Sequence, residues 1–204
     1  MAIRLIAGLG NPGRKYERDR HNAGFRFVQR LAERERVSLR SEAKFHGIAG
    51  RIAAATGDVW LLMPQTYMND SGRSVAQLAR FYKIVPEEIL VVHDELDFEP
   101  GTVKLKLGGG VAGHNGLKDI HAVFGTQAFW RLRIGIGHPG DRSQVADYVL
   151  HPPRPEENAL IEEAIERALD VAPLILAEDL TGAMHRLHTK PKPPPSPADE
   201  KSEE

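Results

Sequence analysis

The sequence predicts a single α/β domain with a mixed central β-sheet flanked by helices. Short apolar runs typical of buried strands alternate along the chain with longer segments that repeat apolar side chains at helical spacing. Residues 103–107 instead alternate apolar side chains with Lys104 and Lys106, as a strand with one solvated face does. A chain of 204 residues with 41% apolar side chains is long enough to bury one sizeable core.

Each expected element has a local pattern behind it. The expected strands are apolar or alternating runs bounded by turn residues, and they cover residues 3–9, 47–55, 58–63, 89–92, 103–107 and 131–136. The expected helices repeat apolar positions every three or four residues, and they cover residues 22–36, 71–82, 114–124 and the stripe from 160 to 169. The turn between the second and third strands is predicted by Thr56-Gly57-Asp58.

The last sixteen residues differ in composition from the rest. Residues 189–204 contain five prolines, and Ala198 is their one apolar side chain. Such a segment buries too little apolar surface to offset the loss of chain entropy on folding. We therefore expect a folded domain at residues 1–188 and a disordered Pro-rich tail at 189–204.

Composition excludes several classes of protein. The chain has no cysteine, which rules out disulfides, a thiolate nucleophile and Cys-ligated metal sites. No apolar stretch approaches the roughly 20 residues of a membrane span, and the apolar run after Met1 is too short for a secretory signal. We expect a cytoplasmic protein without membrane contact.

Charge is unevenly distributed although the net charge is −1. Residues 1–50 carry 11 basic and 5 acidic side chains, and residues 151–204 carry 6 basic and 12 acidic ones. Residues 101–150 are also basic, so two basic blocks can meet as one face for a polyanion. Charge counts alone favour the simpler interpretation of scattered solvated charges.

The segment Gly8-Leu9-Gly10-Asn11-Pro12-Gly13 matches the G-x-G-x-x-G pattern of dinucleotide sites. That pattern requires a helix to begin at once, so that its N-terminus faces the pyrophosphate. Here a turn and a strongly charged stretch intervene, and the next helical pattern starts near Asn22. We therefore expect no dinucleotide cofactor.

Polar residues at strand ends suggest a hydrolytic site instead. Asn11 follows the first strand and Asp94 follows the strand at 89–92, so both reach one sheet edge if these strands are parallel neighbours. His21 opens the next helix and can reach the same edge. An imidazole oriented by a carboxylate is the minimal apparatus for activating water. Taken singly, His21 as a surface residue beside a helix cap at Asn22 and Asp94 as a turn carboxylate are the more common interpretations.

Two loops carry amides near glycines. Asn69 and Asn115 can bind a peptide backbone or a carbonyl, although Asn also favours helix N-caps. The glycines at 108–110 indicate a mobile or closely approached loop. His185-x-x-His188 lacks an evident third ligand, and no G-x-S-x-G elbow occurs, so neither a metal site nor a serine nucleophile is expected.

Taken together, these motifs resemble one family. The resemblance rests on five blocks that occur in the family's order over roughly residues 3–188. The blocks are the segment from Gly8 to Phe25 with Tyr16 and Arg20-His21-Asn22, then Thr66-Tyr67-Met68-Asn69, Ile89 to Asp97, Gly108 to Lys118, and Arg131 to Gly137. They resemble the bacterial-type peptidyl-tRNA hydrolases. The resemblance implies an esterase that frees tRNA from prematurely released peptidyl-tRNA, on a single α/β domain with a mixed sheet.

The resemblance also implies roles for individual residues. His21 would be the base that activates water and Asp94 would orient it, with neither cofactor nor metal, in a monomer. It implies that Asn11, Asn69 and Asn115 hold the ester, the water and the peptide backbone. Tyr16, Met68 and His114 would also bind the substrate, with Met68 and His114 lining the peptide channel. Lys104, Lys106 and Arg133 would hold the tRNA, including its terminal phosphate. The chain departs from the family at Val111 and Ala112, where His and Gly are usual, which bears on the mobility of the Gly-rich loop.

Two alternatives from other classes stay open at this point. One is a non-catalytic RNA-binding protein with the same fold, which would have no need of both His21 and Asp94. A turnover assay separates it from an esterase. The other is a dinucleotide-dependent enzyme, which a fluorescence titration with the cofactor would reveal.

Overall fold

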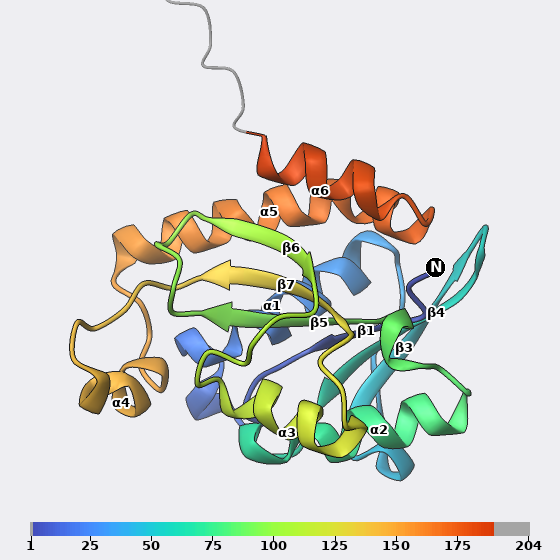
Figure 1. Ribbon diagram of the computed structural model, residues 1–204, viewed down its shortest axis with the longest axis horizontal. Helices are drawn as coiled ribbons and strands as arrows, with labels where there is room; N and C mark the ends of the chain where they lie inside the picture. The colour runs from blue at the N-terminus through green and yellow to red at the C-terminus, as the bar shows by residue number, and fades with distance from the viewer. Residues whose placement is uncertain (1, 190–204) are drawn as a thin grey trace, which may run out of the picture.

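The computed structural model describes residues 2–189, in which a seven-stranded mixed sheet lies between two layers of helices (Figure 1). The strands are β1 (Leu5–Gly8), β2 (Arg40–Glu42), β3 (Gly47–Ala54), β4 (Gly57–Pro64), β5 (Ile89–Glu95), β6 (Val103–Leu107) and β7 (Trp130–Gly135). The α-helices are α1 (Ala23–Arg34), α2 (Ser71–Phe81), α3 (Asn115–Phe124), α4 (Val145–Val149), α5 (Pro155–Leu176) and α6 (Leu180–His188).

The strand order is β2-β3-β4-β1-β5-β7-β6. The central pairs β1–β4, β1–β5 and β5–β7 are parallel, whereas β2–β3, β3–β4 and β6–β7 are antiparallel. The sheet is therefore mixed, as the sequence predicts. The hypothesis that the first strand and the strand at 89–92 are parallel neighbours is confirmed by the register Gly8↔Val92.

Helices cover both faces of the sheet. Alternate side chains of β1 point to opposite sides, so that Ile6 joins the core under α1, α5 and α6, and Leu5 joins the core under α2 and α3. Figure 1 shows α5 and α6 on one side of the sheet and α2 and α3 on the other. Burial on both faces explains why the central strands are continuous apolar runs.

Most expected elements are present with shifts of one to three residues at their ends. Three elements were not among the expected ones. β2 is three polar residues that pair with β3, and α4 is five residues long, so neither has a clear sequence signal. α6 does have one, because Leu180, Ala183, Met184 and Leu187 follow helical spacing after the N-cap residue Asp179. The predicted tail at 189–204 lies, Thr189 apart, outside the described residues. In the described part of the chain no helix is both long and apolar enough to cross a membrane.

The uneven charge has a structural cause that the sequence interpretation missed. Arg26, Arg30 and Arg34 on α1 form ion pairs with three acidic side chains of α5, namely Glu162, Glu166 and Asp170. Part of the basic N-terminal block is thus neutralised by the acidic C-terminal block. The idea that both basic blocks form one face is wrong for these α1 arginines.

Two glycines let α1 pass unusually close to the sheet. A Cβ atom on Gly24 would lie 2.3 Å from the carbonyl oxygen of Val92, and one on Gly8 would lie 2.2 Å from the carbonyl oxygen of Gly24. Real side chains cannot approach backbone so closely. The close approach brings the start of α1 against the ends of β1 and β5, where the candidate site lies.

We predict that Gly24→Ala lowers the free energy of unfolding by about 1–3 kcal/mol, because the added methyl group must push α1 away from β5. Gly110→Ala is the matched control, since a Cβ there meets nothing within 4 Å. Denaturant unfolding of both variants checks this. Equal stability of Gly24→Ala and Gly110→Ala would contradict the close approach.

Candidate active site

The candidate site lies at the carboxyl ends of β1 and β5. Asp94 is part of β5, which is buried along its whole length, and Asn11 lies in the loop after β1. His21 lies in the single-turn helix η2 (Arg20–Asn22) that leads into α1. All three residues therefore lie at one edge of the sheet, as expected from their positions in the sequence.

His21 and Asp94 form a buried dyad. Nδ1 of His21 lies 3.0 and 2.9 Å from the two carboxylate oxygens of Asp94, and the two residues are 7% and 2% exposed. A carboxylate only accepts hydrogen bonds, so Nδ1 carries the proton and donates a hydrogen bond to Asp94. In the neutral ring Nε2 then carries the lone pair, which is the tautomer that a general base needs.

A second imidazole binds the same carboxylate. Nε2 of His114 lies 2.9 Å from Oδ1 of Asp94, and its ring centroid is 4.9 Å from that of His21. Nδ1 of His114 accepts hydrogen bonds from the backbone N–H groups of Gly116 and Leu117 and so caps α3. His114 therefore carries its proton on Nε2 and donates a hydrogen bond to Asp94. The sequence did not predict this contact.

Burial and charge set the protonation of this cluster. Burial alone would lower the pKa of His21, but the charge and hydrogen bond of Asp94 outweigh it and raise that pKa above its ordinary value. Burial alone would raise the pKa of Asp94, but the two imidazoles hold it well below its usual range. Burial, together with the nearby His114, lowers the pKa of His93 to about 3, so this neighbour of Asp94 is neutral.

Asn11 is held in place by a second amide. The backbone N–H of Asn11 donates to Oδ1 of Asn22 at 2.9 Å, and Nδ2 of Asn22 donates to the carbonyl oxygen of Asn11 at 3.0 Å. Oδ1 of Asn11 accepts from the backbone N–H of Met68 at 2.8 Å. Asn22 is the N-cap residue of α1, as the sequence interpretation has it, but its side chain binds Asn11 instead of making a capping hydrogen bond. The sequence signal for these hydrogen bonds between Asn11 and Asn22 is only the position of Asn22 next to His21.

The other expected amides face solvent. Asn69 and Asn115 are exposed, and neither caps a helix, because the cap of α3 is His114 and the N-cap residue of α2 is Asp70. Met68 is buried, whereas Tyr16 is half-buried with the Lys15 ammonium 4.7 Å from its ring centroid. The helix-cap alternative for Asn69 and Asn115 is thus excluded.

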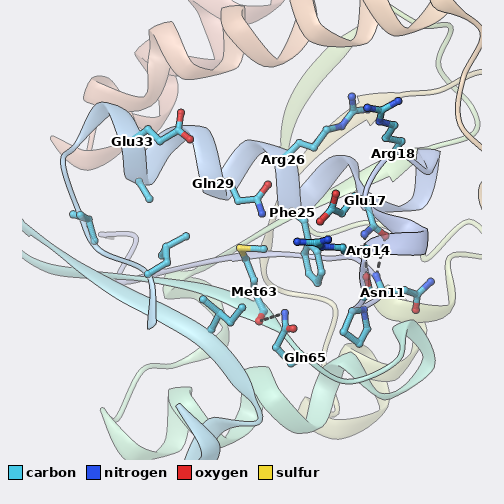
Figure 2. A pocket seen from close by; sticks show the side chains of 17 residues that line it. Asn11, Arg14, Glu17, Arg18, Phe25, Arg26, Gln29, Glu33, Met63 and Gln65 are labelled. Atoms are coloured by element: carbon cyan, nitrogen blue, oxygen red, sulfur yellow. Dashed lines mark hydrogen bonds between the residues drawn. The ribbon is translucent and has the colours of Figure 1, made fainter. Parts of the chain in front are cut away.

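Two cavities adjoin these residues. One of about 530 Å³ is lined by His21, Asp94, His114 and Asn115 together with Ala112 and Gly113. The other, of about 870 Å³, lies beside Asn11 between α1 and the β3–β4 pair, and Figure 2 shows Asn11, Phe25, Met63 and Gln65 on its wall. The dyad therefore borders open space that a substrate can enter.

The expected tRNA-binding residues lie together on β6 and β7, but they differ in whether an acidic side chain pairs with their charge. Lys104 pairs in register with Arg133, and Lys104 and Lys106 are exposed without an ion pair among the described residues. Nε of Arg133 donates to Glu95 at 2.8 Å, and its guanidinium lies 4.4 Å from the ring centroid of Phe98. Much of the charge of Arg133 is thus already compensated, which the sequence did not indicate.

His21, Asp94 and His114 also form a group that can be compared with a metal site. Their ligand atoms lie within 4.8 Å of one another. His114, however, uses Nδ1 to accept two backbone N–H groups and Nε2 to donate, so its neutral ring has no lone pair left for a metal. The cluster fits hydrogen bonding better than metal ligation.

A carboxylate-backed imidazole on a cavity wall is typical of enzymes that activate water by general-base catalysis. Comparison with known proteins narrows this class. A family model described as peptidyl-tRNA hydrolase matches residues 5–195. The chain belongs to the peptidyl-tRNA hydrolase family.

Individual relatives agree over nearly the whole chain. A peptidyl-tRNA hydrolase of Nitrosomonas europaea is 60% identical over 190 residues, covering 93% of this chain and 97% of that protein. One of Thiobacillus denitrificans is 60% identical over 193 residues, covering 95% and 94%. The crystal structure of peptidyl-tRNA hydrolase from Acinetobacter baumannii superposes with a TM-score of 0.88 at 48% identity, covering 92% of this chain and 95% of that one.

Proposed function

We propose that this chain, which as a member of its family hydrolyses the ester bond of peptidyl-tRNA, uses His21 as the general base and Asp94 to orient it. Nε2 of His21 accepts a proton from water while the water oxygen attacks the ester carbonyl carbon. Collapse of the tetrahedral intermediate breaks the bond between that carbon and the ribose oxygen, and the imidazolium returns its proton to the ribose oxygen. The products are a free peptide and tRNA.

The observation that carries this proposal is the buried His21–Asp94 contact on a cavity wall. Asp94 accepts from Nδ1 of His21, which leaves Nε2 as the base. The carboxylate also stabilises the imidazolium that forms when water is deprotonated. Pure RNA binding would gain nothing from burying such a pair, because a buried charge costs free energy.

The orientation of Asn11 suggests its part in the reaction. Its Oδ1 is occupied by the N–H of Met68, so Nδ2 is the group left to donate to substrate. An amide donor held in place can stabilise the negative charge that develops on the ester oxygen. Exposed Asn69 and Asn115 are free to bind the peptide backbone.

The β6–β7 corner is proposed to hold tRNA phosphate. Lys104 and Lys106 project from the exposed face of β6, next to Arg133 on β7. Phosphate contacts position a substrate without taking part in its chemistry. Because Glu95 already pairs with Arg133, Lys106 offers the freer charge.

His21→Ala should leave a folded protein whose kcat for an N-acetylaminoacyl-tRNA falls by about 10²–10⁴, as expected for loss of a general base. Asp94→Asn should cost less, because the base itself remains. His46→Ala is the control, since His46 is exposed on a loop away from the site. Near-wild-type turnover by purified, folded His21→Ala would disprove the assignment.

Lys106→Glu should raise KM for the tRNA ester with little change in kcat, and Arg133→Glu should raise it less. Each lost phosphate contact should also flatten the salt dependence of binding by about one unit of log–log slope. Lys44→Glu, an exposed change near the opposite edge of the sheet, controls for net charge. If KM and slope match the Lys44 control in both variants, the tRNA is held elsewhere.

A further inference from the structure

A buried arginine lies next to the site without a part in the mechanism above. Arg131 on β7 is 2% exposed and is the bulkiest of the fully buried side chains of the described residues. The neighbouring carboxylate, Glu95, pairs with Arg133 instead. Burial and the nearby positive charge of Arg133 lower the pKa of Arg131. Burying a guanidinium without a carboxylate partner costs free energy that an apolar side chain would not cost.

What the guanidinium gains is a pair of hydrogen bonds to one loop. It donates to the carbonyl oxygen of Gly110 and, at 2.7 Å, to that of Gly109, while its charge lies 4.6 Å from the ring centroid of Phe129. Gly109 and Gly110 belong to the glycine-rich loop, residues 108–114, that joins β6 to α3. A charged donor forms the stronger kind of hydrogen bond to a carbonyl.

The glycine-rich loop has little else to hold its shape. Its backbone is left-handed at Gly108, Gly109 and Gly113 and also at Ala112, where a Cβ makes that conformation unfavourable. Val111 packs against the core under α2 and α3. The two bonds from Arg131 therefore fix the middle of a loop that is otherwise held at its ends and at one apolar side chain.

The far end of the glycine-rich loop enters the catalytic cluster. Ala112 and Gly113 line the same cavity as His21, and the next residue is His114, whose ring binds Asp94. The backbone N–H of His114 donates to the carbonyl oxygen of Val111, one residue after the carbonyls that Arg131 holds. A displacement of residues 109–111 would therefore displace His114 as well, because this hydrogen bond links the two.

We propose that Arg131 is a positioning residue for the hydrolysis, which holds the glycine-rich loop so that His114 keeps its hydrogen bond to Asp94. This inference rests on the proposed function of His21 and Asp94. Arg131 touches no reacting atom, and its effect is exerted through the loop and His114. An apolar side chain of similar length would fill the same space but leave two carbonyl groups unheld.

The consequence of losing this contact can be measured as a change in the pKa of His21. The groups that face His21 are Asp94, His114 and, on its own segment, Asp19, while Glu95, Asp97, His138 and Arg142 line the same cavity. Of these, only the contact of His114 depends on the glycine-rich loop. If it loosens, Asp94 loses one hydrogen-bond donor and its carboxylate binds the proton of His21 more strongly. The pKa of His21 then rises, and the acid limb of the pH profile of kcat/KM moves to higher pH.

The experiment compares Arg131→Met and Arg131→Lys with Arg30→Met, a partly buried arginine on α1 that lines neither cavity and is remote from the loop. The substrate is an N-acetylaminoacyl-tRNA, and melting temperature is recorded for each variant. Arg131→Met should lower kcat by about tenfold to a hundredfold, the scale expected from misplaced catalytic groups, and should shift the acid limb upward. Arg131→Lys should recover part of kcat, because one ammonium group can hold one carbonyl. Arg30→Met should change stability but neither kcat nor the acid limb.

A double variant shows whether Arg131 acts through His114. In a His114→Ala background, adding Arg131→Met should lower kcat much less than it does in the wild type. If Arg131→Met lowers kcat by the same factor with and without His114→Ala, the proposal is overturned. An acid limb at the wild-type pH in folded Arg131→Met would overturn it as well. If Arg131→Met does not fold, the same comparisons are made with Arg131→Lys. Wild-type hydrolysis that persists in His21→Ala would instead disprove the proposed function.

Discussion

The carboxylate of Asp94, held by two imidazoles at once, is the interaction on which the site depends. One oxygen accepts from Nε2 of His114 at 2.9 Å, and both lie within 3.0 Å of Nδ1 of His21. A carboxylate that is 2% exposed would be costly to keep charged without such donors. Its charge fixes the tautomer of both rings, and of the two only His21, which lines the cavity, keeps a ring nitrogen without a hydrogen bond among the described residues. The chemistry of the base thus follows from how Asp94 is satisfied.

The fold supplies the three partners from three directions. β5 lies in the middle of the sheet and carries Asp94 to its edge. η2, which leads into α1, presents His21 from one side, and the close contact of Gly24 with Val92 brings the start of α1 near to the sheet. α3 and the glycine-rich loop present His114 from the other side. The sheet edge is where both helical layers can reach the same carboxylate, which is the general reason that α/β proteins place their sites there.

Part of this arrangement could be predicted from sequence. The apolar patterns predict the strands before Asn11 and Asp94, and the hypothesis that these strands are parallel neighbours, which is confirmed, brings Asn11, Asp94 and His21 within reach of one edge of the sheet. The resemblance then supplied the reaction and the substrate. The contact of His114 with Asp94 could not be predicted, because it depends on where α3 packs. The pairing of Arg133 with Glu95 and the ion pairs between α1 and α5 likewise join segments far apart in sequence, and no local pattern encodes them.

The same limit explains why charge counts misled. Basic and acidic blocks at the two ends of a chain suggest separate faces, but here α1 and α5 bring them together. What remains exposed and uncompensated on the β6–β7 corner is two lysines, a smaller surface than the totals imply. A polyanion site is therefore defined by the charges that the fold leaves unpaired, not by the charges the chain contains.

The pH dependence of kcat/KM for wild type and Asp94→Asn, measured side by side on one N-acetylaminoacyl-tRNA, tests most directly whether Asp94 sets the basicity of His21. The base must be neutral to act, so activity is lost as pH falls through the pKa of His21. Asp94 raises that pKa, so the wild-type acid limb should lie above the ordinary histidine value of about 6.5. Burial without the carboxylate charge should move the limb of Asp94→Asn to lower pH. Coincident acid limbs in the two proteins would contradict the account.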